Sequence, residues 1–338
     1  NIVLFLMHRK KIHIVTDGSK EIGFGHIARC ISFYDKFSEL GYKVELLIDG
    51  EGISRNLLEN RKYRLIEWHR EITLLDFCKE SVLFLDSLIA TQKQTDYMQQ
   101  LAYCFIVIDD FRRRSYKRAF IIDWTPNVEH TGKHSHNRHN NNCLLLGLEY
   151  SVLRQPFTEP SFYSIREMSA LTVIMGGTDV HGLTYPLVKQ ISISFPEIRI
   201  YAVLGPGTPD LPECPKGVKV YRELDAGQLK EVFLQSDLVV SAGGQTLFEL
   251  AALRVPTIAI KVADNQEEDL TGLMTLGFLD KIFCWNASSL SEEIMEKIRF
   301  LRSADSRKKY LSDFRFPGIG KGLDKIMERI QHYCHESI

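Results

Sequence analysis

The chain has 338 residues, of which 44% are hydrophobic and 25% charged, and its formal net charge is -1 at pH 7. This length suits two domains that each bury a core, and the composition is typical of a soluble globular protein. A charge so near zero gives no argument for binding nucleic acid or an acidic membrane surface, so local geometry must hold any anionic ligand. The seven cysteines are scattered and form no C-x-x-C pair, which argues against a disulfide framework or zinc ribbon.

The first six residues are apolar and precede Met7 and the basic residues 8–11. A signal peptide has the reverse order, with its charges before a longer apolar run. We therefore interpret residues 1–6 as an upstream extension rather than a targeting segment. No stretch has the length of a transmembrane helix, and the scattered cysteines fit a reducing cytosol, so we predict a cytoplasmic protein without a membrane-bound part.

The first half of the chain alternates short apolar runs with amphipathic segments. Helical spacing of apolar residues from Ile27 to Phe37 predicts a helix that ends at Gly41. The apolar runs predict strands at residues 12–16, 43–48, 82–85, 105–108, 119–122 and 144–148. This alternation predicts a parallel, doubly wound sheet, in which ligands gather at the carboxyl ends of the strands.

The second half repeats the pattern after a connector near residues 150–168. It predicts a helix at 183–193, another at 320–333, and strands at residues 171–175, 198–204, 238–241 and 257–260. The fold class is therefore α/β, with two Rossmann-like domains whose parallel sheets face a central cleft. We place the domains at residues 7–152 and 169–318, and expect residues 319–338 to form a helix that packs back on the linker.

A glycine-rich turn joins the first strand to the first helix. Gly23, Gly25 and Ala28 satisfy a G-x-G-x-x-A pattern, and Asp49 ends the following strand, so a nicotinamide enzyme is a rival hypothesis. In a true dinucleotide fingerprint the first glycine directly follows the strand, whereas several residues intervene here. His26 also occupies a position at which the backbone should approach a pyrophosphate, which further disfavours the rival.

His26 is the candidate general base. It lies in the first turn of the predicted helix, where the helix dipole and Arg29, one turn later, both disfavour the imidazolium. A neutral ring could accept a proton near pH 7. The alternative is a histidine at a helix start that bonds a nearby carbonyl.

The turn that starts at Ser241 is the strongest candidate for anion binding. It follows an apolar strand and opens a helix, so Gly243 and Gly244 would expose backbone N–H groups to a diphosphate. No G-K-[ST] ending follows, which excludes a P-loop. Thr246 and Glu249 have capping-box spacing, and acceptance of hydrogen bonds from a ribose is the alternative role of Glu249.

Two further turns follow strands of the second half. Gly176-Gly177-Thr178-Asp179 is a glycine turn, and Ala263-Asp264-Asn265-Gln266 precedes another helix. Asp264 or Asn265 could be the N-cap of that helix. Together the three turns favour a ligand site more than any one of them does.

Two groups of residues could suggest a metal. The spacing of four histidines in the polar segment 129–142 does not match a zinc site, and we predict a solvated loop for His130, His134, His136 and His139. Asp86 and the pair Asp109-Asp110 could imitate a metal pair, but acids at strand ends are common caps and turn formers. We predict neither a metal nor another cofactor.

Taken together, these motifs resemble the UDP-sugar hydrolase family of pseudaminic-acid biosynthesis. The resemblance runs from about residue 12 to about residue 280 and rests on the turn at 17–30, on Gly147–Arg154 and on the three turns of the second half, in the family's order. It implies a GT-B fold, similar to that of the lipid-II-forming transferase of peptidoglycan synthesis. It also implies hydrolysis of UDP-2,4-diacetamido-2,4,6-trideoxy-β-L-altropyranose to the free sugar and UDP.

By this resemblance, His26 deprotonates a water that attacks C1 with inversion, and the second domain holds UDP. The diphosphate would lie at the turn 241–246, the ribose near Glu249 and the sugar near Asn265. The expected substrate-binding residues are Asp17, Gly18, Gly23, Gly25, Arg29, Gly176, Gly177, Thr178, Asp179, Ser241, Ala242, Gly243, Gly244, Thr246, Glu249, Asn265 and Gln266.

Leu88 departs from the family, which often has a tyrosine near the sugar at this position and thus a hydroxyl that leucine lacks. A non-catalytic UDP-sugar binder is therefore one alternative. Another is a GT-B glycosyltransferase, which would need an acceptor surface. Arg112-Arg113-Arg114 is a basic run of the kind that could contact a lipid carrier, but a solvated face is the expected role of such a run.

Overall fold

The computed structural model describes residues 10–19, 23–51, 53, 58–110, 112–126, 128, 141–159, 161, 163–315 and 320–336. The chain divides into two compact units. Unit 1 comprises Asn1–Val152 and Lys321–Ile338, and unit 2 comprises Leu153–Gly320. Residues 153–168, which the sequence suggested as a connector, thus belong to unit 2.

Unit 1 contains a parallel sheet of seven strands in the order β3-β2-β1-β4-β5-β6-β7. The strands are β1 (Lys11–Gly18), β2 (Lys43–Gly50), β3 (Tyr63–Leu65), β4 (Val82–Asp86), β5 (Cys104–Ile108), β6 (Ala119–Asp123) and β7 (Cys143–Leu146). The central strands β1 and β4 pair directly, with Thr16 opposite Asp86. Chain order reverses between these two strands, so their carboxyl ends form the topological switch point at which such sheets bind ligands.

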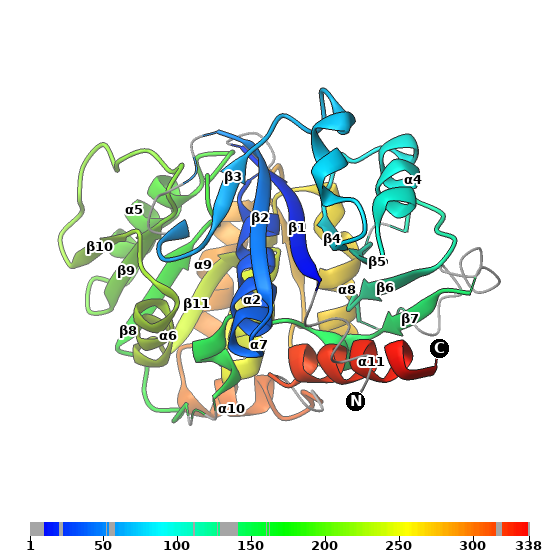
Figure 1. Ribbon diagram of the computed structural model, residues 1–338. Helices are drawn as coiled ribbons and strands as arrows, with labels where there is room; N and C mark the ends of the chain where they lie inside the picture. The colour runs from blue at the N-terminus through cyan, green and yellow to red at the C-terminus, as the bar shows by residue number, and fades with distance from the viewer. Residues whose placement is uncertain are drawn as a thin grey trace. The chain divides into compact units, whose positions relative to one another are not determined.

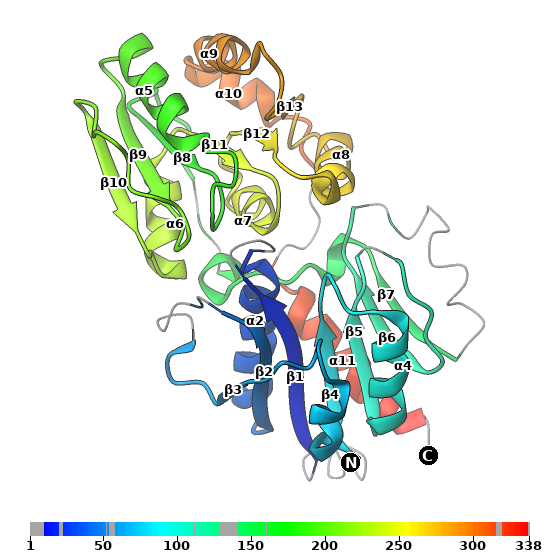
Figure 2. The same cartoon turned by 90° about the horizontal axis from the view of Figure 1, so that it is seen from above.

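The helices of unit 1 cover both faces of this sheet (Figures 1 and 2). They are α2 (Gly25–Glu39), α4 (Gln92–Leu101), α11 (Gly322–Glu336) and the 3-10 helices η1 (Ile72–Cys78) and η4 (Leu148–Tyr150). Helix α2 packs on β1 and β2 because its apolar residues recur every three or four positions, and Phe33 and Phe37 are almost completely buried. Each such phenylalanine contributes about 2 kcal/mol of hydrophobic stabilisation.

The opposite face of the sheet packs against η1 and α4. Val15 and Leu83 of the sheet share a core there with Leu75 of η1 and Met98 of α4. Both faces of the central strands are thus covered, which explains why they appear in the sequence as continuous apolar runs.

Unit 2 contains a second parallel sheet, of six strands in the order β10-β9-β8-β11-β12-β13. The strands are β8 (Ala170–Ile174), β9 (Arg199–Leu204), β10 (Val218–Arg222), β11 (Leu238–Ala242), β12 (Thr257–Lys261) and β13 (Ile282–Cys284). Its helices are η5 (Gln155–Thr158), α5 (Thr184–Ser194), α6 (Ala226–Gln235), α7 (Gln245–Leu253), η6 (Asp264–Gln266), α8 (Glu267–Thr275), α9 (Leu290–Phe300) and α10 (Ala304–Tyr310). The switch point of this sheet lies between β8 and β11, which pair directly.

The core of unit 2 combines these strands with α5 and α9. Val173 and Val240 of adjacent strands are completely buried with Val188 of α5 and Ile294 of α9. The two parallel sheets confirm the predicted α/β class with two Rossmann-like halves.

The C-terminal helix α11 belongs to unit 1. Lys325 Nζ lies 2.8 Å from Glu149 Oε2, and Asp324 Oδ1 lies 2.8 Å from Lys36 Nζ of α2.

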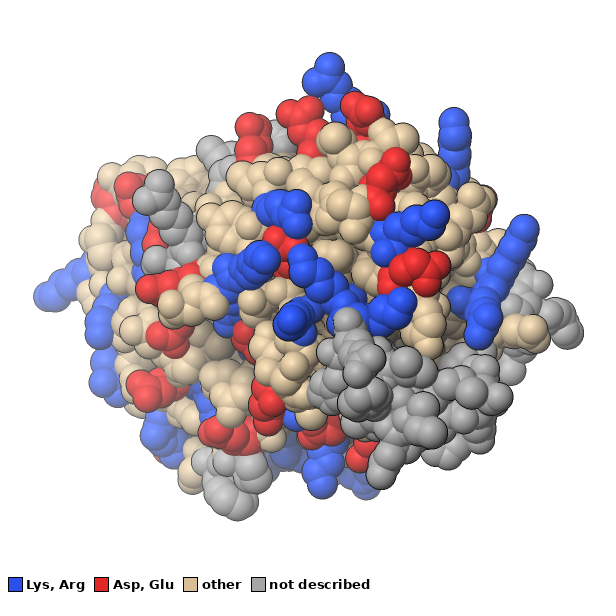
Figure 3. Space-filling model, viewed as in Figure 1, with Lys and Arg blue, Asp and Glu red and all other residues tan. Residues whose placement is uncertain are grey.

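The face displayed in Figure 3 has acidic side chains among its basic ones, rather than a field of one sign. Among the described residues, no helix combines the length and the apolar character that a membrane span requires.

Candidate functional site

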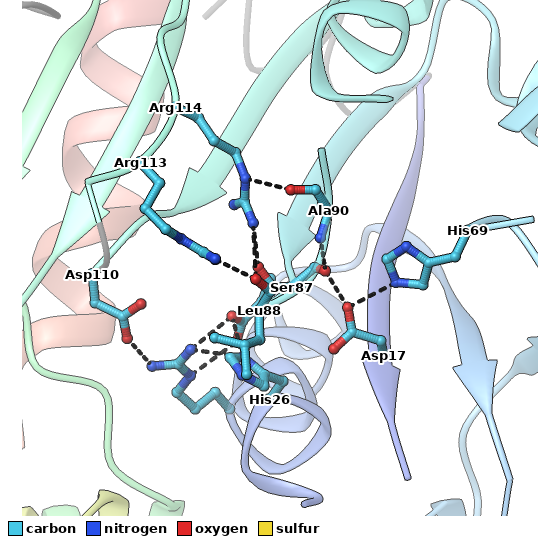
Figure 4. A network of polar contacts seen from close by, with 11 residues as sticks. Asp17, His26, His69, Ser87, Leu88, Ala90, Asp110, Arg113 and Arg114 are labelled. Atoms are coloured by element: carbon cyan, nitrogen blue, oxygen red, sulfur yellow. Dashed lines mark hydrogen bonds and ion pairs between the residues drawn. The ribbon is translucent and has the colours of Figure 1, made fainter. Parts of the chain in front are cut away.

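In unit 1, the predicted base and an acid meet at the switch point between β1 and β4. His26 is the second residue of α2, which follows β1, and Asp86 is the last residue of β4. His26 Nδ1 lies 2.7 Å from Asp86 Oδ1, and the contact is part of the network drawn in Figure 4. The sequence interpretation missed Asp86, which we expected only to form a cap or a turn.

This contact determines which nitrogen of His26 is available. Asp86 is 1% exposed, and an unprotonated Nδ1 only 2.7 Å from its carboxylate oxygen would place two lone pairs against each other. The proton therefore lies on Nδ1, which donates to Asp86, and a neutral ring has its lone pair on Nε2. Nε2 has no hydrogen-bond partner among the described residues. His26 thus has the geometry of an oriented general base.

Arg29 links this pair to a second acid. Its Nε lies 2.9 Å from Asp86 Oδ2, and its Nη1 lies 2.6 Å from Asp110 Oδ2. Its Nη2 lies 2.7 Å from Asp86 Oδ1, so the guanidinium forms a fork on one carboxylate. Nη2 is also 2.9 Å from His26 Nδ1, but that nitrogen donates to Asp86 and cannot accept as well.

The charges around Asp86 keep it ionised. Burial alone would raise the pKa of Asp86, but the Arg29 guanidinium and His26 outweigh burial and hold that pKa below its usual range. Burial would lower the pKa of Arg29, yet Asp110 and Asp86 raise it well above its ordinary value. The ionised form of Asp86 is therefore favoured, and its negative charge can stabilise an imidazolium on His26.

A second histidine–aspartate pair adjoins the first (Figure 4). Asp17, at the end of β1, is 1% exposed, and its Oδ2 lies 3.0 Å from His69 Nε2. The same oxygen accepts a hydrogen bond from Ser87 Oγ, and Ser87 directly follows Asp86 in the chain. The Ser87 hydroxyl in turn accepts a bond of 3.0 Å from the Ala90 N–H. Asp17, predicted to bind substrate, thus stabilises the turn after β4 through its contact with Ser87.

The basic run at residues 112–114 also holds this turn. Arg114 is 3% exposed and donates to the carbonyls of Ser87 and Ala90 at 2.7 and 2.9 Å. Arg113 donates to the Leu88 carbonyl, and Arg112 Nη1 lies 2.7 Å from Asp123 Oδ2. The expectation of a solvated face was wrong for Arg112 and Arg114, because a buried acid and backbone carbonyls draw their guanidinium groups inward, whereas Arg113 is exposed.

The glycines of the turn between β1 and α2 are each suited to their positions for a different structural reason. Gly23 has φ +80°, a left-handed conformation that favours glycine, and its N–H donates to the Ser19 carbonyl at 2.8 Å. A side chain on Gly18 would lie 2.5 Å from Ile27 Cδ1, whereas one on Gly25 would meet nothing within 4 Å. Gly25 therefore leaves open space directly before His26.

In unit 2, two of the predicted glycine turns flank the switch point. Gly176 and Gly177 follow β8, while Gly243 and Gly244 follow β11 and precede α7. The first N–H groups of a helix lack intrahelical partners and favour anions. A Cβ on Gly243 would lie 2.5 Å from Gln266 Oε1, so a larger residue there would force the Gln266 side chain to shift.

Other predicted residues of these turns have partners within the protein. Ser241 is buried and donates to the Ala242 carbonyl at 2.9 Å, and Ala242 is itself buried. The Asp179 carboxylate accepts bonds from the N–H groups of Leu183 and Thr184, at 2.8 and 2.9 Å, and so caps the start of α5. Thr178 and Thr246 are half-buried.

Glu249 forms an ion pair that the sequence did not predict. Its carboxylate is completely buried and accepts two bonds from Arg154, at 2.6 and 2.7 Å. The expected capping box with Thr246 was wrong, because α7 has Gly244 as its N-cap and no side-chain capping bond. Burial would lower the pKa of Arg154, but Glu249 outweighs burial and raises it.

The third turn of unit 2 connects to the glycine turn. Gln266 donates to the Gly243 carbonyl at 3.1 Å and accepts from the Val262 N–H at 2.9 Å. Asp264 and Asn265 are exposed, and neither forms a capping bond at the start of η6 or α8. The N-cap expectation for these two residues was therefore wrong.

No group of three or more potential metal ligands occurs among the residues that the structure describes. The four histidines at 130, 134, 136 and 139 lie outside the described residues.

Comparisons with known proteins match these observations at the level of the fold. No family model matches the chain. An uncharacterized protein of Methanocaldococcus jannaschii is 22% identical over 278 residues, covering 76% of this chain and 57% of that protein. A Helicobacter pylori protein named pseudaminic acid cytidylyltransferase and UDP-2,4-diacetamido-2,4,6-trideoxy-beta-L-altropyranose hydrolase is 23% identical, covering 76% and 46%. The chain thus spans about half the length of the curated relatives it matches.

Solved structures are similar over nearly the whole chain. The Methanocaldococcus jannaschii UDP-GlcNAc 2-epimerase, determined with UDP-GlcNAc and UDP, has a TM-score of 0.63 at 11% identity and covers 95% of this chain and 99% of its own. Acinetobacter baumannii MurG has a TM-score of 0.54 at 11% identity, covering 95% and 99%. The chain therefore has a GT-B-like fold, similar to those of MurG and the UDP-GlcNAc 2-epimerase.

Proposed function

We propose that this protein hydrolyses a UDP-linked 2,4-diacetamido-2,4,6-trideoxyhexose to the free sugar and UDP, as part of nonulosonate synthesis. The observation that carries the proposal is the His26–Asp86 pair, with Nδ1 and Asp86 2.7 Å apart and Nε2 left available. The hydrolase name of the Helicobacter pylori relative supports the choice of substrate.

In the proposed reaction, His26 Nε2 takes a proton from water while the water oxygen bonds to C1 of the sugar. The bond between C1 and the oxygen of the β-phosphate breaks, and UDP leaves with the electron pair, so the configuration at C1 inverts. Asp86 stabilises the imidazolium that forms, because its carboxylate accepts the Nδ1 proton in a buried site. Such a base contributes about 10²- to 10⁴-fold to the rate.

Unit 2 is the proposed UDP-binding unit. The diphosphate would bind the start of α7 at Gly243 and Gly244, where helix N–H groups stabilise the charge that develops on the leaving group. Glu249 is occupied by Arg154, so we propose that the ribose meets this ion pair rather than an unpaired carboxylate. We expect activity without an added metal, and a chelator should leave the rate unchanged.

A glycosyltransferase remains the alternative. Its support is a Clostridium perfringens relative named UDP-N-acetylglucosamine–N-acetylmuramyl-(pentapeptide) pyrophosphoryl-undecaprenol N-acetylglucosamine transferase, 26% identical over 181 residues and covering 52% of this chain and 50% of that protein. The basic run at residues 112–114 no longer favours an acceptor surface, because Arg112 and Arg114 are turned inward.

The test is UDP release from UDP-2,4-diacetamido-2,4,6-trideoxy-β-L-altropyranose, without acceptor or metal, by wild type and His26→Ala. Release by wild type that falls at least 100-fold in the variant would support hydrolysis with His26 as base. No release by wild type, despite binding of UDP, would refute the hydrolase assignment for this sugar and favour the transferase or a non-catalytic binder.

A further inference from the structure

An aromatic pair, with Trp285 exposed and His181 half-buried, lies at strand ends of unit 2. The rings of His181 and Trp285 are parallel to within 4°, with their centroids 3.6 Å apart. His181 belongs to the loop between β8 and α5, and Trp285 directly follows β13. The pair therefore lies at the carboxyl edge of the sheet, where ligands of doubly wound folds bind.

Three contacts fix the pair in place. His181 Nε2 lies 2.8 Å from the carbonyl of Val262, which follows β12, so Nε2 carries the proton and donates. The backbone N–H of Trp285 donates to the Lys261 carbonyl at 3.1 Å, and the backbone N–H of Gly182 donates to the Asp179 carbonyl at 2.8 Å. The aromatic pair is thus anchored to the ends of β12 and β13, neighbouring strands in Figure 2.

The indole has a surface that the protein leaves uncovered. Trp285 is 39% exposed, whereas Trp68 and Trp124 are 0% and 3% exposed. His181 stacks on one face of the indole, so the area that Trp285 exposes lies elsewhere on this residue. Within the described part of the chain, neither Trp285 Nε1 nor His181 Nδ1 has a hydrogen-bond partner. The pair therefore offers exposed aromatic surface, one donor and one acceptor.

We infer that His181 and Trp285 form a binding platform for the sugar ring of the nucleotide-sugar, an inference that rests on the proposed function. A pyranose presents C–H groups on its face and polar groups at its edge, which matches an exposed indole with a donor and an acceptor at its rim. A 6-deoxy sugar with two acetamido groups is richer in such apolar surface than a fully hydroxylated hexose. Gln266 connects the Val262 end of β12 to the Gly243 turn, so the platform adjoins the proposed diphosphate site.

The experiment measures binding of UDP and of UDP-2,4-diacetamido-2,4,6-trideoxy-β-L-altropyranose in a His26→Ala background, which prevents turnover. Calorimetry on Trp285→Ala should show about three- to tenfold weaker binding of the UDP-sugar and unchanged binding of UDP, the scale expected for an aromatic contact. Trp285→Phe, which keeps a flat ring, should recover most of the affinity. His181→Ala should weaken UDP-sugar binding less than Trp285→Ala.

Acrylamide quenching of tryptophan fluorescence gives a second readout, because Trp285 is the exposed tryptophan. The UDP-sugar should protect Trp285 from quencher, and UDP alone should not. Equal affinity of Trp285→Ala and its parent for the UDP-sugar would overturn the inference. If UDP protected Trp285 as well as the UDP-sugar does, and Trp285→Ala bound both ligands equally more weakly, the nucleobase would lie on the platform. That result would also overturn the inference. Wild type that binds the UDP-sugar through Trp285 without hydrolysing it would refute the proposed reaction and leave the platform supported.

Discussion

Replacing Asp86 by asparagine tests how far the His26 base depends on its partner. Asp86 Oδ1 faces His26 Nδ1 and Arg29 Nη2, each at 2.7 Å, and Oδ2 faces Arg29 Nε at 2.9 Å. In either orientation, the amide nitrogen of asparagine would face an arginine N–H. With the nitrogen toward His26, Nδ1 would have to accept, and the proton would move to Nε2 and block the base. With the carbonyl toward His26, the imidazolium would lose its stabilising charge.

We therefore expect kcat of Asp86→Asn to fall about 10²- to 10⁴-fold, which corresponds to about 3–5 kcal/mol of transition-state stabilisation. The assay is steady-state UDP release, with UDP affinity and thermal stability measured in parallel to show that unit 2 is intact. Asp110→Asn is the matched control, because it removes the 2.6 Å contact to Arg29 Nη1 and keeps the His26–Asp86 pair. A kcat within threefold of wild type, or an equal loss in the control, would show that the His26 base does not depend on Asp86.

Three further predictions concern unit 2 and the stability of unit 1. Glu249→Gln should lower the free energy of unfolding by about 3–5 kcal/mol, because Arg154 loses its buried counterion; unchanged denaturant midpoints would contradict this. Gly243→Ala should weaken UDP binding at least about tenfold, since its Cβ would lie 2.5 Å from Gln266 Oε1. Gly227→Ala, in α6, is the control. An equal loss of UDP affinity in the two variants would count against the proposed diphosphate site. Burial lowers the pKa of His13 from 6.5 to about 4. As the pH falls from 6.5 to 4, His13 therefore binds a proton in the unfolded state only. The free energy of unfolding should fall by up to about 3 kcal/mol over that range. His13→Gln should remove this loss, and an unchanged pH dependence in the variant would be the contrary result.

The sequence predicted the elements of the fold well because their signals are local. Buried parallel strands are continuous apolar runs, and the face of α2 repeats at helical spacing from Ile27 to Phe37. The same locality placed His26 in the first turn of a helix. Each glycine turn was expected after a strand, which is where the structure has them.

The partners of the site residues could not be predicted, because they are distant in sequence. Asp86 is 60 residues from His26, and Arg154 is 95 residues from Glu249. Where a local rule was applied instead, as in the capping box of Glu249 and the solvated role of Arg114, a buried long-range contact prevailed. Pairing of a buried charge is worth more than a surface cap, so tertiary contacts decide these cases.

The most direct test of the proposed hydrolysis is the fate of oxygen from labelled water. UDP-2,4-diacetamido-2,4,6-trideoxy-β-L-altropyranose would be turned over in H₂¹⁸O without acceptor or metal, and the products analysed immediately by mass spectrometry. Attack of water at C1 predicts ¹⁸O in the free sugar and none in UDP, with label incorporation that depends on His26. Label in UDP, or no turnover until an acceptor is added, would contradict the account.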